Sequence, residues 1–388
     1  MKKVLIISNG YPGFGGQSTT AHHLGSLLNK NNIKCKVFFL NEVKMIKDVD
    51  TKTIINSDEI IIKRNLLKGG LRSFVQAILK NKVSIKLGIT FLSSILYRQI
   101  KAKLVVKKIK NFLNETEFYP NLVITNSPKM YDKISKIFHN TIIIIGSSSI
   151  ISNHFKKKID YITISKNKEY LQIKNKKSHQ KYLLDNYIIF NSPLTFNLYK
   201  KLGFQMPRAN VQFFNFFPFS ATDILFKSRK YDLGVVVSWF SRKVKNPEKI
   251  NKLFKLLPNV IKVAIGKGSN NFENIENIEK YDLVSQKELS KILSNTKLII
   301  IPSLFDSSPS ILSEAILNGC NVLISKNVGW HEMIEKDCVI ENFFDDNEWI
   351  KKINILVKNK IQNSVFKNHI QNSQTEITNL IKQQLNKF

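Results

Sequence analysis

The chain is poor in acidic side chains. Of its 388 residues 29 are Asp or Glu and 60 are Lys or Arg, so the formal net charge is +31. No acidic residue occurs between Glu59 and Glu115. A charge of this size indicates attraction to an anionic partner, which leaves a membrane surface, a nucleic acid and a polyanionic substrate as the open classes.

Cysteine and long apolar runs are also scarce. The three cysteines, Cys35, Cys320 and Cys338, have neither the spacing of metal ligands nor an even number, so we expect small core residues in a reducing compartment rather than disulfides. No uninterrupted apolar segment approaches the roughly 20 residues of a membrane span. These absences predict a cytoplasmic protein, either free or peripheral on the inner face of the cell membrane.

Short apolar runs recur along the whole chain, with loops or helix-compatible segments between them. They predict buried strands at 2–8, 34–40, 59–63, 121–125, 141–146, 186–191, 231–238, 260–268, 297–303, 321–325 and 338–342. Runs that are apolar throughout, rather than alternating with polar residues, are typical of parallel sheets covered on both faces. The fold class is therefore α/β, with Rossmann-like parallel-sheet domains.

The length exceeds that of a usual single core, so two domains are expected. The periodic pattern is interrupted between Phe213 and Asp232, and we place the boundary between residues 218 and 219. The tail, 363–388, is polar and compatible with one continuous helix.

The richest stretch is IPSLFDSSPSILSEAILNGCNVLIS at 301–325, which joins a strand end, a polar loop and a helix start. Ser308 is the expected N-cap, with Pro309 at the first helical position, and Gly319 is the expected stop. Asp306 lies before the helix and Glu314 lies inside it, so both carboxylates can point into one cleft. A carboxylate can accept hydrogen bonds from two hydroxyl groups, as the recognition of sugars and ribose requires.

The first turn of that helix is a candidate phosphate site. Free amides and a partial positive charge gather at a helix N-terminus, so Ser307, Ser308, Pro309 and Ser310 are the expected contacts of phosphate oxygens. A plain strand-loop-helix whose glutamate is only solvated is the alternative explanation.

Cations follow the first strand of the second half. Arg242, Lys243 and Lys245 come after the run 231–238, and a helix is expected to begin near Pro247. Fixed cations at a strand exit can neutralise a phosphate leaving group. A solvated basic turn would show the same residues.

Glycines in two loops allow a close approach of the backbone to a ligand. Gly15 and Gly16 lie in the loop after the first strand, expected to span 9–20, and Gly266 follows the strand at 260–268. Many α/β domains need such glycines simply to turn the chain.

Together, Arg242 to Lys245 and the pair Asp306 and Glu314 resemble the motifs of the retaining GT-B glycosyltransferases, the group 1 or family 4-like enzymes. The first acid of their acidic-x7-acidic signature is usually glutamate, and aspartate takes its place in this chain. The spacing from Arg242 to Lys245 is also shorter than is common in the family, and Lys243 is the alternative cation. The resemblance implies two Rossmann-like domains facing across a cleft.

The resemblance also implies roles for the site residues. Asp306 would orient the donor sugar, Glu314 would bind the ribose, and Arg242 with Lys245 would stabilise the departing diphosphate without a metal or other cofactor. Gly15, Gly16, Gly266 and the segment 307–310 would bind the donor, a nucleotide-diphosphate sugar. Residues 1–218 would form the acceptor domain, 219–362 the donor domain, and 363–388 a helix that crosses back to the first domain.

The basic segment 63–110 can form amphipathic helices whose apolar faces rest on lipid and whose cations reach anionic head groups. A pair of core helices with solvated lysines is the alternative. Nucleic acid is not an expected partner, since no recognisable nucleic-acid-binding motif accompanies the charge. Asn126 with Ser127, and Asn191 with Ser192, end two strands of the first half and are either acceptor contacts or helix caps.

These features predict a retaining hexosyltransferase that moves a sugar to an acceptor hydroxyl, in cell-surface polysaccharide or lipid-linked glycan synthesis. The family is described by front-face attack, in which the donor phosphate helps to take the acceptor proton. A catalytically inactive, membrane-associated glycan-binding or scaffold subunit is the main alternative. A sugar-nucleotide epimerase and a basic nucleic-acid binder also stay open.

Overall fold

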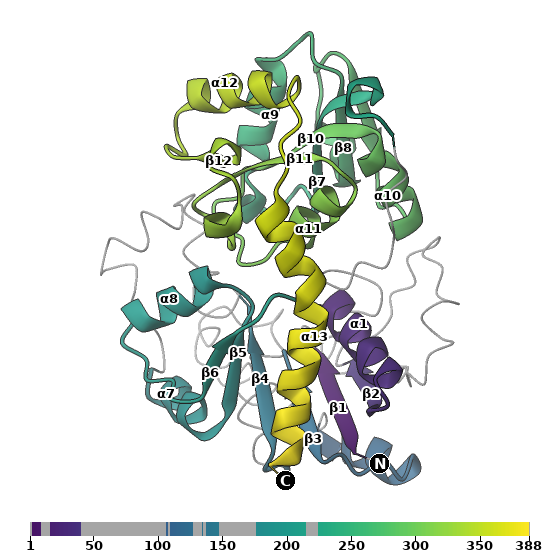
Figure 1. Ribbon diagram of the computed structural model, residues 1–388, viewed down its shortest axis with the longest axis vertical. Coiled ribbons are helices and arrows are strands. Elements are labelled where there is room, and N and C mark those ends of the chain that lie inside the picture. Colours follow the sequence, from purple (N-terminus) through teal and green to yellow (C-terminus); the bar gives the residue numbers. More distant parts are fainter. Residues whose placement is uncertain are drawn as a thin grey trace, which may run out of the picture. The chain divides into compact units, whose positions relative to one another are not determined.

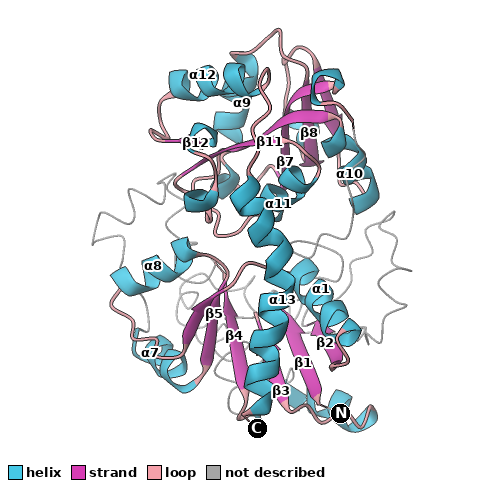
Figure 2. Ribbon diagram, in the orientation of Figure 1, coloured by secondary structure: helices cyan, strands magenta, loops and turns pink. Residues whose placement is uncertain are grey.

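The structure, a computed structural model, contains two six-stranded sheets with helices packed against them (Figure 1, Figure 2). The strand orders are β2-β1-β3-β4-β5-β6 and β12-β11-β10-β7-β8-β9. The residues described are 2–8, 16–39, 106–107, 109–126, 134, 137–146, 176–214 and 224–387. By internal contacts the chain divides into two compact units, Met1–Met45 with Lys52–Thr141, and Ile46–Thr51 with Ile142–Phe388.

The first unit is built on a central strand. Its elements are β1 (Lys3–Ser8), α1 (Gly16–Lys30), β2 (Lys34–Phe39) and β3 (Leu122–Thr125). Strand β1 pairs in parallel with β2 and with β3, and its residues from Val4 to Ser8 are buried. Leu5, Ile7, Phe38 and Val123 belong to one buried cluster, as the uninterrupted apolar runs predict.

The second unit begins within β4 and first completes the sheet that contains β4. The elements are β4 (Thr141–Ile145), α7 (Lys176–Asp185), β5 (Tyr187–Phe190), α8 (Pro193–Lys201) and β6 (Ala209–Val211). Helix α8 begins sharply because Ser192 caps it and Pro193 occupies its first turn. Strand β5 pairs in parallel with both β4 and β6.

The same unit contains the whole second sheet. Its strands are β7 (Tyr231–Trp239), β8 (Lys262–Lys267), β9 (Ile278–Tyr281), β10 (Thr296–Ile301), β11 (Asn321–Ser325) and β12 (Val339–Ile340). Its helices are α9 (Pro247–Lys255), α10 (Gln286–Ser294), α11 (Ser310–Leu317), α12 (Asp346–Leu356) and α13 (Ser364–Asn386). Helices α9 and α12 pack against each other, whereas α11 contacts α10 and α13 (Figure 1).

The chain order of the second sheet creates a switch point. From β7 the chain proceeds to β8 and β9, and α10 then returns it to β10, on the other side of β7. Ligands of open α/β sheets bind at the carboxyl ends of the strands where the order reverses. The loops after β7 and β10 are therefore the place where this sheet offers a site.

Two strands differ from the sequence-based expectation. Neither β6 nor β9 was expected, and both lie at a sheet edge. Their residues are all half-buried, and their sequences, ANV and IEKY, mix polar and apolar side chains. A signal based on apolar runs misses such strands because an edge needs no continuous apolar segment. The strand expected at 59–63 lies outside the described residues.

The expected C-terminal helix is confirmed, because α13 runs unbroken with Asn363 at its start. Its crossing back onto the first domain stays a prediction. So does the domain boundary between residues 218 and 219, which falls on a part of the chain that is not described.

All three cysteines are free and buried, which confirms them as core residues. Burial raises the pKa of the Cys320 thiol to about 12 and that of the Cys338 thiol to about 11. Within the described ranges no helix combines the length and the apolar character needed to cross a membrane.

Candidate functional site

The loop between β10 and α11 differs in one detail from the sequence-based expectation. Helix α11 begins at Ser310, and Pro309 rather than Ser308 occupies the N-cap position, with no side-chain cap. The expectation of Ser308 as cap is therefore wrong, because the extended backbone of Pro309 (φ −70°, ψ 123°) places it just before the first helical residue. Gly319 does end the helix, and its φ of +72° is the left-handed conformation that favours glycine.

Asp306 is held by the loop that follows β11. Its backbone amide donates to Asn327 O at 3.0 Å, and its carbonyl accepts the amide of Gly329 at 2.7 Å. These contacts form a short parallel bridge between Asp306 and Val328. The backbone of the first acid is thus fixed from the neighbouring strand, which leaves its carboxylate to interact with other groups.

Gly329 permits this contact. A Cβ atom built there would lie 1.7 Å from Ser307 O and 2.8 Å from Ser192 Cβ, so no larger residue fits without movement. The next residue, Trp330, has a φ of +70°, which is unusual for a bulky side chain. The turn at 329–330 therefore packs against the end of β5 and against the loop before α11.

Lys245 and Asp306 form an ion pair. Their side chains are 16% and 13% exposed, so the pair is shielded from solvent but not sealed. The turn Lys243–Lys245 is also tied to the loop after β10 by its backbone, because Leu304 N donates to Val244 O at 2.9 Å. The two loops at the switch point therefore bring a cation and a carboxylate together, and the donor-binding roles expected for these two residues stay a prediction.

Arg242 is not part of this pair. It is exposed and starts the short 3₁₀ turn, and no ion pair of its side chain with any described residue exists. Helix α9 begins at Pro247, as expected, and Asn246 caps it. With this short spacing, Lys245 lies beside Asp306 and Arg242 does not.

Glu314 lies in the middle of α11 and is almost fully buried, with 8% of its surface exposed. Burial raises the pKa of its carboxyl group from 4.5 to about 7. No described residue donates a hydrogen bond to the carboxylate. A buried carboxylate without a partner is unfavourable for folding, and groups of this kind gather at functional sites.

The three predicted glycines have different outcomes. Gly15 lies outside the described residues, and Gly16 is the first residue of α1, so the helix begins earlier than the expected loop allows. Gly266 has a φ of +137°, and a Cβ there would lie 1.6 Å from Val237 O. Close packing of β8 against β7 already explains a glycine at 266, and donor binding by all three stays a prediction.

The polar residues at the strand ends of the first sheet differ in their contacts. Ser192 is a cap, as its hydroxyl accepts the amide of Thr195 at 3.3 Å. Asn191 instead reaches the loop before α11, where its Nδ2 donates to Ser307 Oγ at 3.0 Å. Asn126 is buried at the end of β3, and Ser127 lies outside the described residues.

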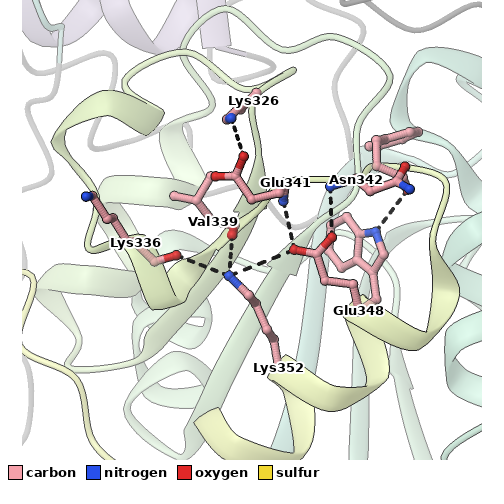
Figure 3. A network of polar contacts seen from close by, with 9 residues as sticks. Lys326, Lys336, Val339, Glu341, Asn342, Glu348 and Lys352 are labelled. Carbon is pink, nitrogen blue, oxygen red and sulfur yellow. Dashed lines mark hydrogen bonds and ion pairs between the residues drawn. The ribbon is translucent and has the colours of Figure 1, made fainter.

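Helix α12 supports the segments on either side of β12 (Figure 3). The carboxylate of Glu348 accepts the backbone amides of Glu341 and of the residue after it, both at 2.8 Å. Lys352, one turn later, donates to Val339 O at 2.5 Å. Lys326, the first residue after β11, forms an ion pair with Glu341. The loop that holds Asp306 is thereby anchored at its start.

The partners of Asp306 were missed by sequence reasoning. Asn327 and Gly329 lie in the stretch KNVGW, which is part of the segment GCNVLISKNVGWHEMI that shares in the family resemblance, but the resemblance implied no contact of this stretch with Asp306. The usable signal was indirect, because β11 is the parallel neighbour of β10 and adjacent carboxyl ends share one edge of a sheet. Among the described residues, no three or more His, Cys, Asp or Glu side chains gather as a metal site would require.

Comparison with known proteins agrees with this architecture. Residues 223–373 match the family "Glycosyl transferases group 1". No curated protein matches the sequence.

Solved structures match over nearly the whole length. Sucrose-phosphate synthase from Thermosynechococcus elongatus is similar with a TM-score of 0.69 and 13% identity, covering 99% of each chain. The Anabaena protein HepE in complex with UDP-glucose gives 0.66 and 13%, covering 100% of each chain. WaaG, a glycosyltransferase involved in lipopolysaccharide biosynthesis, gives 0.57 and 11%, covering 97% of this chain and 99% of that one.

At these identities the structural likeness establishes the fold, and the family match extends over residues 223–373 of the chain. The chain therefore has the GT-B fold, and its part with the second sheet and helices α9 to α12 is similar in sequence to the group 1 glycosyl transferases.

Proposed function

We propose that the protein transfers a hexosyl group from a UDP-sugar to an acceptor hydroxyl with retention of the anomeric configuration. The observation that carries the proposal is the pair of Lys245 and Asp306 at the switch point, next to the start of α11. A cation, a carboxylate and a helix N-terminus at one strand edge suit the diphosphate and sugar of such a donor. The Anabaena relative HepE was solved with UDP-glucose, which supports uridine as the base to test first.

Each site residue has a proposed role. Lys245 stabilises the departing diphosphate, and Arg242, at the exposed start of the same turn, adds a second cation. The backbone of Ser307, Ser308 and Ser310 contacts phosphate, with Pro309 fixing the chain direction. Asp306 orients the sugar. These roles require no metal, because fixed cations neutralise the leaving group.

Glu314 is the proposed ribose ligand. Its carboxylate has no partner in the described structure, and an ionised carboxylate can accept two hydroxyl groups. Gly15, Gly16 and Gly266 are the proposed close approaches of the backbone to the donor.

The reaction breaks the bond between the anomeric carbon and the diphosphate oxygen, and it forms a bond from that carbon to the acceptor oxygen. The acceptor proton passes to the departing phosphate. Front-face attack of this kind retains the configuration without a protein nucleophile, so the residues of the chain act by positioning and by charge.

The acceptor we propose is a lipid-linked glycan or a cell-surface polysaccharide precursor, met at the inner face of the cell membrane. Support comes from the formal charge of +31 and from the similarity to WaaG. The basic segment 63–110, the proposed lipid contact, lies largely outside the described residues. Flotation with liposomes that contain anionic lipid should carry the protein upward, and flotation that does not depend on anionic lipid contradicts this part.

Release of UDP from UDP-glucose, measured with and without added acceptor, tests the central proposal. Glu314→Ala and Arg242→Ala should reduce turnover, whereas Lys243→Ala, an exposed neighbour in the same turn, should not. Unchanged rates in both site variants, with wild-type circular dichroism, contradict these roles. Conversion of the donor without any acceptor identifies an epimerase instead.

A further inference from the structure

Asn191 occupies an unusual position at the end of β5. Its backbone carbonyl accepts the indole Nε1–H of Trp330 at 2.9 Å. Its side-chain Nδ2 donates to Ser307 Oγ at 3.0 Å, across 116 residues of sequence. One residue therefore joins the loop after β11 to the loop before α11, and both of these loops hold Asp306.

The Trp330 contact is built with some strain. A tryptophan with a φ of +70° is uncommon, and such conformations persist where the surroundings enforce them. Trp330 is 4% exposed, and its ring packs edge-on against Phe213 with the centroids 5.3 Å apart. The indole is thus locked in place, and its N–H fixes the backbone of Asn191.

The Ser307 contact determines what that hydroxyl can do. A hydroxyl has one proton to donate and two lone pairs that accept. Because Ser307 Oγ accepts from Asn191, its own proton stays available, and no described residue accepts it. Ser307 is 4% exposed and directly follows Asp306 in the loop before α11. Its hydroxyl is therefore a directed donor within the proposed diphosphate site.

The amide of Asn191 is not explained by stability. Its Oδ1 is buried and has no hydrogen-bond partner in the described structure. A buried acceptor without a donor opposes folding, so an apolar residue of the same shape would serve a purely structural role better. The side chain is better explained by the proton direction that it imposes on Ser307.

We propose that Asn191 is a positioning residue, which turns the Ser307 hydroxyl so that it donates to an oxygen of the donor diphosphate. The inference rests on the proposed function and adds to it a residue from the first sheet. Asn191 itself does not contact the donor in this account. It acts through Ser307, and this dependence can be measured.

The experiment is a double-mutant cycle on the full chain. UDP affinity is measured by calorimetry, and kcat/KM is measured with UDP-glucose, for wild type, Asn191→Ala, Ser307→Ala and the double variant. Each single variant should bind UDP on the order of tenfold more weakly, as expected when a hydrogen bond to a charged oxygen is lost. The double variant should be no weaker than Ser307→Ala, because Asn191 has nothing left to orient.

Two further variants separate positioning from folding. Asn191→Asp keeps the size of the side chain but offers only acceptor oxygens, so the Ser307 proton turns toward it and UDP affinity should fall as in Ser307→Ala. Ser192→Ala, the matched control, removes the neighbouring cap of α8 and should lower the melting temperature while UDP affinity stays unchanged.

The outcomes are distinct. If the losses of UDP affinity in Asn191→Ala and Ser307→Ala multiply in the double variant, the role of Asn191 is overturned while the proposed function stands. Wild-type UDP affinity in Asn191→Asp has the same meaning. If wild type binds neither UDP nor UDP-glucose and releases no UDP, the proposed function and this inference both fall. Wild-type melting behaviour in Asn191→Asp with the expected loss of affinity supports the proposal.

Discussion

The two ends of helix α11 are built in opposite ways. At the C-terminal end, Gly319 N donates to Ile316 O at 3.0 Å and Cys320 N donates to Ala315 O at 2.9 Å, which is a Schellman motif. Arg229 donates to Asn318 O at 3.2 Å, and Lys360 donates to Gly319 O at 2.6 Å. Carbonyls and the negative end of the helix dipole are thus satisfied within the protein.

Within the described ranges, the N-terminal end has no such side-chain partners for its backbone. Pro309 gives no side-chain cap, and the carboxylate of Glu314 accepts no hydrogen bond from any described residue. Among the described residues at this end there is one ion pair, between Lys245 and Asp306, and both groups belong to the proposed donor site. The difference shows that one end of this helix is closed by contacts within the described residues, and under the proposed function the other end is the one that receives the donor. Four substitutions test that division.

The largest effect is expected for Lys245→Ala. Loss of a fixed cation at the leaving group should reduce kcat on the order of 100- to 1000-fold, as removal of a single charge-stabilising donor does. The melting temperature should also fall, because the mostly buried Asp306 carboxylate then loses its cation, so kcat is compared per folded molecule. Lys243→Ala is the control. Equal losses in both variants would show that the turn matters only as a basic surface.

The second largest effect is expected for Glu314→Gln, which should raise the free energy of unfolding and lower the affinity for UDP. The pKa of the Glu314 carboxyl is about 7 in the folded protein and 4.5 in the free group. Between pH 4.5 and pH 7 the folded state therefore binds more protons than the unfolded state, so the free energy of unfolding decreases as the pH rises through this range. At pH 8 to 9 the variant should be more stable by about 3 kcal/mol, and this gain should vanish below pH 4.5.

The same variant should bind UDP more weakly, since a neutral amide replaces the carboxylate that accepts ribose hydroxyls. Urea unfolding across the pH range and UDP calorimetry give the two readouts. A variant that is destabilised at every pH would assign Glu314 to the folded core instead of the site.

Gly319→Ala tests the other end. A Cβ at this position would lie 2.7 Å from the Arg229 guanidinium, and the residue keeps a φ of +72°. The strain should lower the free energy of unfolding by about 1–2 kcal/mol. Transfer rates per folded molecule should stay at the wild-type level, and a specific loss of UDP affinity would mean that the two ends are coupled.

Lys360→Met should have the smallest effect. The side chain is exposed, although its amine caps Gly319 O, so the loss should be about 0.5 kcal/mol. Chemical denaturation with matched m-values measures it. A loss as large as that of Gly319→Ala would show that the cation, rather than the backbone motif, maintains the helix end.

Local signals in the sequence were enough for much of this helix and its strand. The run KLIIIPS predicts β10, Gly319 predicts the stop, and the spacing of Asp306 and Glu314 predicts two carboxylates around one helix start. Each of these depends on neighbours within a few residues. The family resemblance followed from the same short stretch.

The remaining features depend on contacts between distant segments. Asn327 and Gly329 bind the backbone of Asp306 through strand adjacency, and Asn191 reaches Ser307 from another sheet. No local pattern encodes such pairs. The exposure of Arg242 was also not foreseen, because whether a residue three positions from Lys245 faces the same group depends on the 3₁₀ turn between them.

The buried thiols give the protein a practical advantage. Cys35, Cys320 and Cys338 are all shielded, and the protonated form of the latter two is favoured up to strongly alkaline pH. Maleimide reagents attack the accessible thiolate, so the native chain should label slowly at neutral pH. A single cysteine introduced at an exposed position, such as Phe344, would then carry a fluorophore without prior removal of the native ones.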